Sequence, residues 1–137
     1  MAHKKNQEND IDFEIRFYEG VLNKTDGNFL QVLIALGDLY TKKGLYEKGL
    51  SVDRKLATRC PRDPVILYNL ACSYSLVNNL AQAYRALKKA VRYGYDNFEH
   101  MFRDKDLENL IRDRRFRYFF ARLTRRKDSS TNTLKTE

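Results

Sequence analysis

The sequence predicts an all-α solenoid of antiparallel helix pairs, and an internal repeat of 34 residues is the main reason. Four residues of the first copy recur at the same spacing in the second: Leu33, Leu36, Gly37 and Tyr40 become Leu67, Leu70, Ala71 and Tyr74. Self-similarity at this period is typical of stacked supersecondary units that bury their apolar faces against one another. Turn signals at matching places in the two copies support the same class.

Three helices are expected in the first half of the chain. The first covers 11–23, where apolar residues recur at helical spacing, and the turn cluster 25–28 ends it. The second covers 29–43 and ends at Gly44, which can adopt the left-handed conformation of a helix C-cap. The third covers 46–60. The apolar stripe of the first helix consists of Ile11, Ile15, Tyr18 and Leu22.

Two further helices form the second copy of the repeat. One is expected over 64–77, because Pro64 suits the first helical position and Asp63 suits the N-cap. The turn 78–79 separates it from a helix over 80–93. All these connections are short, so consecutive helices should lie antiparallel. Small residues within each copy, Gly37 among them, should allow the paired helices to approach closely.

The positive charge is concentrated in the last third of the chain. Residues 85–127 hold 14 Lys and Arg against 6 Asp and Glu, which accounts for the whole net charge of +8. Phe116 and Phe120 should face the core, while the arginines cover the outside of a terminal cap. The alternative is one basic face for nucleic acid or an acidic protein. This face would comprise Arg112, Arg115, Arg122, Arg125 and Arg126.

The sequence holds no pattern that indicates catalysis, a metal or a cofactor. Asp104, Asp106 and Asp113 stand just before the segments 107–110 and 114–116, and they are expected to cap helices rather than to form a metal or acid/base site. His100 has no ligand partner at metal-binding spacing. Cys60 and Cys72 have no nearby His in the sequence, so they are expected to be reduced thiols of a cytoplasmic protein. No apolar run is long enough to cross a bilayer, and no membrane contact is expected.

The two copies resemble the tetratricopeptide repeat, whose 34-residue pattern runs aromatic, Leu-Gly, Tyr, Ala, aromatic, Ala and Pro. The second copy carries it as Leu67, Leu70-Ala71, Tyr74, Ala83, Leu87 and Ala90. The first carries it as Leu33, Leu36-Gly37, Tyr40, Gly49, Leu56 and Pro61. Asp53 departs from the pattern where an aromatic residue is usual, and we expect it to expose one helix face locally. The resemblance implies a right-handed superhelical solenoid.

The resemblance divides the chain into a repeat domain over 11–125 between two disordered tails. The C-terminal part is similar to the terminal segment that closes many bacterial repeat arrays, and it is expected to form a two-helix cap. The expected segments are a tail 1–10, a degenerate half repeat 11–29, repeats 30–63 and 64–97, a cap 98–125 and a tail 126–137.

In this family the first helix of each pair lines a concave groove, which implies a non-catalytic adaptor that binds a peptide or helix of another protein. The residues expected in the groove are Gln31, Ile34, Asp38, Val65, Tyr68, Asn69, Cys72, Phe102 and Arg103. Phe102 is equally expected to complete the core. Self-association through apolar faces at the 11–23 end is an alternative. Weak binding of nucleic acid or an acidic protein ranks below the adaptor. The sequence does not identify the partner.

Overall fold

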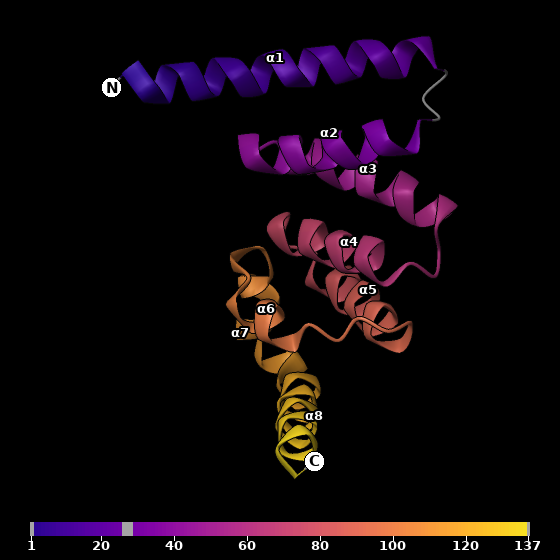
Figure 1. Cartoon of the computed structure of the whole chain (residues 1–137), viewed down its shortest axis with the longest axis vertical. Helices are drawn as coiled ribbons and strands as arrows, with labels where there is room; N and C mark the ends of the chain where they lie inside the picture. Colours follow the sequence, from indigo (N-terminus) through magenta and orange to yellow (C-terminus); the bar gives the residue numbers. More distant parts are fainter. Residues whose placement is uncertain (1, 26–28, 137) are drawn as a thin grey trace.

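The computed structural model describes residues 2–25 and 29–136, and the side chains of residues 10–25 and 29–126. These residues form eight α-helices and two short 3-10 helices without a strand, which confirms the predicted all-α class. Figure 1 shows the helices stacked in chain order, from α1 at the N-terminal end to α8 at the C-terminal end. Residues 26–28 of the expected turn lie outside the described part of the chain.

The four helices of the two repeats begin and end within one residue of their expected bounds. They are α2 (Leu30–Lys43), α3 (Tyr46–Arg59), α4 (Pro64–Leu76) and α5 (Leu80–Arg92). The flanking elements are α1 (Ala2–Lys24), α6 (Phe98–Arg103), η1 (Lys105–Leu107), α7 (Glu108–Arg112), η2 (Arg114–Phe116) and α8 (Arg117–Thr136).

The two ends of the chain differ from the expected organisation. Helix α1 begins at Ala2 and α8 ends at Thr136, whereas disordered tails were expected over 1–10 and 126–137. Neither segment contains Gly or Pro, so nothing stops a helix that the packed residues have begun. The cap contains three α-helices and two 3-10 helices instead of the expected two helices.

The expected helix ends are confirmed at Gly44 and Asp63. Gly44 has a φ of 85° and closes α2 in the left-handed conformation. The Asp63 carboxylate accepts hydrogen bonds from the backbone N–H groups of Val65, at 2.9 Å, and Ile66, at 3.1 Å. These contacts satisfy donors that the first turn of α4 leaves free.

Small residues permit the close crossing of α2 and α3, as predicted. A Cβ atom built on Gly37 would lie 3.0 Å from Oδ1 of Asp53, and one on Gly49 would lie 3.1 Å from Oγ1 of Thr41. Both distances are tighter than ordinary van der Waals contact. A side chain at either position would therefore require the facing side chain, Asp53 or Thr41, to shift by a few tenths of an ångström.

The core consists of two apolar clusters that follow the chain order. The first joins α1, α2 and α3, and the predicted stripe of α1 packs into it, with Ile15 buried. The Tyr40 hydroxyl in α2 also donates a 2.7 Å hydrogen bond to Glu19 in α1. The second cluster joins α4 and α5 to the cap, where Phe116 and Phe120 are buried as expected.

Asp53 does not expose a helix face, so that prediction is wrong. Its side chain lies buried between the repeats and accepts a hydrogen bond from the Ser73 hydroxyl of α4. Burial raises the pKa of this carboxyl to about 6, while the hydrogen bond from Ser73 works in the opposite direction. A polar pair thus occupies a place where the repeat pattern has an aromatic ring.

Candidate binding groove

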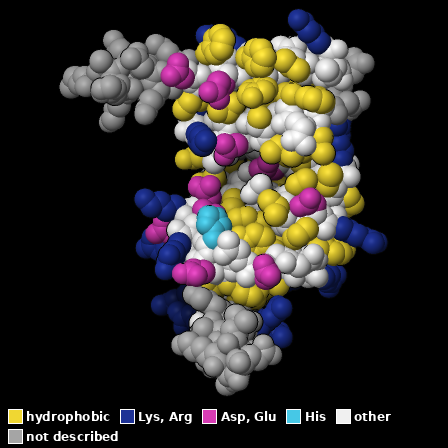
Figure 2. All heavy atoms as spheres, viewed as in Figure 1, with side chains coloured by type: hydrophobic (Ala, Val, Ile, Leu, Met, Phe, Trp, Pro, Cys, Tyr) yellow, Lys and Arg dark blue, Asp and Glu magenta, His cyan; other side chains and the backbone are white. Residues whose placement is uncertain are grey.

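A groove of about 640 Å³ lies between α2 and α4, and the cap closes one side of it with residues of α6 and η1. Figure 2 shows this hollow, with apolar side chains inside it and acidic side chains and a histidine around it. Ile34 and Val65 line the groove and leave 41% and 57% of their surfaces exposed. Exposed aliphatic side chains in a concave surface are typical of a site that binds another molecule.

The groove is acidic. Five carboxylates and one histidine are among the residues that line it, and no described Lys or Arg is among them. Lys42 nevertheless forms a 3.0 Å ion pair with Asp38 one helical turn away. Several carboxylates in one concavity create a negative potential that attracts cations. The five carboxylates are Asp38, Asp53, Asp63, Asp104 and Asp106.

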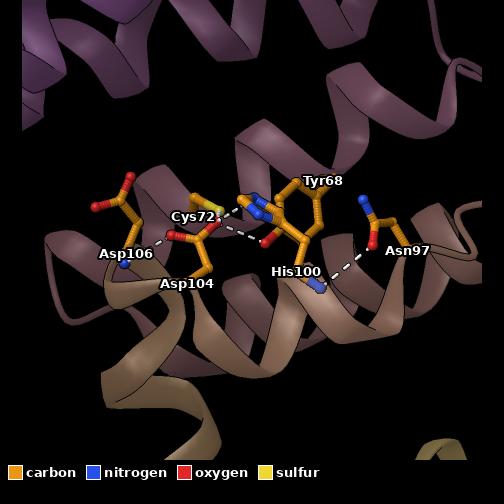
Figure 3. Close-up of polar contacts among 6 residues, drawn as sticks. All are labelled: Tyr68, Cys72, Asn97, His100, Asp104 and Asp106. Atoms are coloured by element: carbon orange, nitrogen blue, oxygen red, sulfur yellow. Dashed lines mark hydrogen bonds and ion pairs between the residues drawn. The ribbon is translucent and has the colours of Figure 1, made fainter.

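A polar cluster at one end of the groove joins α4 to the cap (Figure 3). The Tyr68 hydroxyl donates a 2.6 Å hydrogen bond to Oδ2 of Asp104, and Nε2 of His100 lies 3.2 Å from the same oxygen. The Cys72 thiol contacts that oxygen at 3.7 Å. The Tyr68 ring stacks on the Tyr95 ring, with centroids 4.1 Å apart. Asp104 therefore holds α4, α6 and η1 together.

The expected capping roles of Asp104 and Asp113 are confirmed. Oδ1 of Asp104 accepts a 3.0 Å hydrogen bond from the backbone N–H of Asp106, and Asp113 accepts a 2.9 Å bond from that of Arg115. Burial raises the pKa of the Asp106 carboxyl, and the negative charges of Asp104 and Asp38 raise it further. The charge of His100 works in the opposite direction.

The structure brings His100 and Cys72 to one carboxylate, although no histidine was expected near a cysteine. Burial, together with the charge of Asp104, raises the pKa of the Cys72 thiol well above its usual value. The thiol is therefore protonated at neutral pH, and a protonated thiol is a poor nucleophile. His100 contacts the carboxylate rather than the sulfur, so the cluster does not activate the thiol.

No family model matches the chain. A segment of 80 residues is 32% identical to a chloroplastic protein of Arabidopsis thaliana, and it covers 56% of this chain and 24% of that protein. The chain thus spans about a quarter of the length of this curated relative.

Two solved structures of MamA, a tetratricopeptide-repeat protein, resemble at least nine tenths of the chain. The structure titled MamA 41-end, from Desulfovibrio magneticus RS-1, has a TM-score of 0.65 and 18% identity over 90% of this chain and 70% of that chain. A crystal structure of MamA has a TM-score of 0.59 and 18% identity, over 96% of this chain and 97% of that chain. This chain has the tetratricopeptide-repeat fold. Among its described residues, no helix combines the length and apolarity needed to cross a membrane.

The tetratricopeptide groove contains six of the nine residues expected there, namely Ile34, Asp38, Val65, Tyr68, Asn69 and Cys72. Tyr68 and Cys72 are buried in its floor, whereas Val65 and Asn69 are accessible to a ligand. Gln31 is exposed outside the lining residues. Phe102 is half-buried and packs edge-on against Phe120, so it completes the core. Arg103 pairs with Glu99 at 3.2 Å.

The cap contributes acidic residues to the groove that the sequence did not predict there. Asp104, Asp106 and His100 line it, but the sequence marks the aspartates only as candidate caps. Helix-capping patterns predict where a helix begins, not which other helix it will lie against. No signal in the sequence therefore places these residues opposite Tyr68.

The five arginines of the expected basic face are distributed over α7, η2 and α8. Arg112 pairs with Glu108 at 3.2 Å, and Arg115 pairs with Asp113 at 3.0 Å. The guanidinium groups of Arg122 and Arg126 lie 5.9 and 5.6 Å from the ring centroids of Tyr118 and Phe98. Arg125 is exposed. Two of the five cations are thus already neutralised by carboxylates one helical turn or less away.

Proposed function

We propose that this chain is a non-catalytic protein-interaction scaffold that holds a peptide or helix of a partner in the groove between α2 and α4. The observation that carries the proposal is the concave groove of about 640 Å³ with exposed Ile34 and Val65 inside it. Burial of exposed aliphatic surface is the main favourable contribution to binding a peptide. The MamA likeness concerns the fold, and a scaffold role is a common use of such a fold.

The charge of the groove determines which partners it favours. Its carboxylates, with no described Lys or Arg among the lining residues, favour a segment that carries Lys or Arg beside an apolar anchor. Burial raises the pKa of the Asp106 carboxyl most, and the charges of Asp104 and Asp38 raise it further, so a cation placed near Asp106 would relieve this second contribution. The partner we expect therefore has basic and aliphatic residues within one or two helical turns.

Val65→Arg is expected to weaken partner binding at least tenfold, because it fills the groove with a bulky cation that repels a basic segment. Tyr118→Arg is the matched control, since Tyr118 is 72% exposed and lies outside the groove. The measurement is isothermal titration with a peptide that places Arg and Leu on one helical face. Equal affinity of both variants for this peptide would place its binding outside the groove.

The proposal also includes a cytoplasmic location and a role without catalysis. We expect a cytoplasmic location, in which Cys60 and Cys72 would stay reduced. The proposal needs no cofactor and no metal, and the described residues contain no group of three or more His, Cys, Asp or Glu positioned to hold an ion. Binding of nucleic acid through the C-terminal arginines ranks lower, because Arg112 and Arg115 already have carboxylate partners.

Self-association is a second candidate function, favoured by two exposed phenylalanines on α1, which lie outside its buried apolar stripe. Phe13 and Phe17 lie one helical turn apart and leave 62% and 58% of their surfaces exposed. Two exposed phenylalanines on one helix face are typical of a helix that packs against another chain. Both phenylalanines lie at the 11–23 end, where the sequence predicted pairing between chains.

If α1 pairs between chains, Phe13→Ser with Phe17→Ser should convert the oligomer to a monomer at the same concentration. The loss follows from removing about 2 kcal/mol of transfer free energy for each buried ring. Multi-angle light scattering measures the mass directly, and Tyr118→Ser is the control at another exposed ring. A monomeric parent chain at high concentration would exclude this candidate and leave the groove proposal untouched.

A further inference from the structure

A second cavity, of about 600 Å³, lies between α3 and α5, with α4 forming its floor. Helix α4 contributes different residues to the two concavities: Tyr68 and Asn69 to the groove, but Leu70 and Tyr74 to this cavity. The two sites are therefore separated by one helix. Figure 2 shows the groove face, and the second cavity is built from the helices behind it.

The charge of the second cavity is the reverse of that of the groove. Five cationic side chains line it, and no described Asp or Glu is among the lining residues. None of the five takes part in the ion pairs found among the described residues. Lys88 lies over the Tyr84 ring, with its Nζ 4.4 Å from the ring centroid, and the proposal below therefore rests on the other four cations. The five are Arg54, Arg85, Lys88, Lys89 and Arg92.

Helix α5 presents four of these cations as one stripe. Arg85, Lys88, Lys89 and Arg92 follow the spacing i, i+3, i+4 and i+7, which places them on the same helix face over a rise of about 10 Å. The opposite face, with Ala83 and Leu87 among its residues, is buried in the core. All four residues belong to the basic excess of residues 85–127.

The floor of the cavity is apolar. Leu67 is buried there, Leu70 and Tyr74 are half-buried, and Ala57 and Ala86 complete the surface. A sugar–phosphate backbone offers no aliphatic group to such a floor, whereas a protein segment can place Leu or Phe on it. An apolar floor under a cationic rim matches a segment in which acidic residues flank an apolar side chain.

We propose that the cavity between α3 and α5 docks an acidic amphipathic segment of a partner protein. Carboxylates one turn apart on a partner helix meet Arg85, Lys89 and Arg92, and an apolar side chain between them covers Leu70. This site lies apart from the groove and takes a segment of opposite charge. One chain thereby holds a basic segment in the groove and an acidic segment in the cavity, and the charge of each site excludes the other segment.

The test uses fluorescence anisotropy with a labelled helical peptide that carries Glu on both sides of a Leu stripe, and a twin peptide with Gln in place of Glu. The Glu peptide should bind, more weakly as salt is raised, and the Gln twin should bind at least tenfold more weakly. The double variant Arg85→Glu with Lys89→Glu should bind the Glu peptide at least tenfold more weakly than the parent chain does. Circular dichroism of each variant confirms that the helices are retained.

Arg114→Glu with Arg117→Glu is the matched control, because both residues are exposed cap residues outside the cavity and the change in net charge is the same. An equal loss in the two double variants, or equal binding of the Gln twin, would overturn the proposal. Displacement of the peptide by an unlabelled single-stranded oligonucleotide would reassign the site to nucleic acid. Val65→Arg should leave the Glu peptide unaffected, so failure here and failure of the groove proposal are distinguishable.

Discussion

Asp104→Ala is expected to lower the free energy of unfolding by about 2–4 kcal/mol. The substitution leaves the buried Tyr68 hydroxyl without its 2.6 Å acceptor and removes the side-chain cap of η1. It also removes the partner of His100, at 3.2 Å. Each loss acts where α4 meets the cap. The cap should therefore separate from α4 first, and the groove should lose one of its walls. Urea denaturation followed by circular dichroism measures the change.

Asp113→Ala provides the matched control for this experiment. Asp113 caps η2 as Asp104 caps η1, but its side chain contacts Arg115 of the same turn rather than another helix. Removing it should cost about 1 kcal/mol, the usual contribution of a cap. Equal losses for the two variants would show that Asp104 acts only as a cap. Asp104→Asn keeps one acceptor oxygen in place of the two that serve the cap and Tyr68, so its loss should lie between that of Asp104→Ala and zero.

Asp53 should make the protein less stable at neutral pH than at mildly acidic pH. Burial raises the pKa of its carboxyl from 3.8 to about 6, so the folded state binds this proton more tightly than the unfolded state. Its stabilising contribution is complete below the unfolded pKa and is lost as the pH rises through the folded pKa. A shift of this size corresponds to about 2–3 kcal/mol between roughly pH 4 and pH 7.

Asp53→Asn isolates this contribution from the other titrating groups. The amide has the size of the carboxyl, retains an oxygen that can accept the hydrogen bond from Ser73, and carries no charge at any pH. The difference in unfolding free energy, variant minus parent, should rise by about 2–3 kcal/mol from about pH 4 to pH 7. Chemical denaturation at several pH values gives both curves. Parallel curves would show that Asp53 titrates normally in the folded chain.

The sequence by itself determined the four helices of the two repeats and their order. The 34-residue repeat, Pro64 with Asp63 before it, and Gly44 after α2 placed the helices of the repeats within one residue. These signals are local, because helical spacing and capping depend on residues within one or two turns. The role of Gly37 in the close approach of α2 and α3 could be predicted for the same reason. One face of the helix must approach its partner, and the repeat shows which face that is.

Tertiary structure alone decided the chemistry of the two concavities. Asp53 is polar in a pattern that calls for an aromatic ring, and only the position of Ser73 on α4 makes its burial tolerable. Asp104 contacts both Cys72 and His100 because the cap folds back on α4, which no spacing in the sequence encodes. Likewise, the stripe on α5 becomes a cationic rim only because α3 and α4 leave an apolar floor beside it. Contacts between distant segments depend on how whole helices pack, and the local pattern that forms each helix does not specify them.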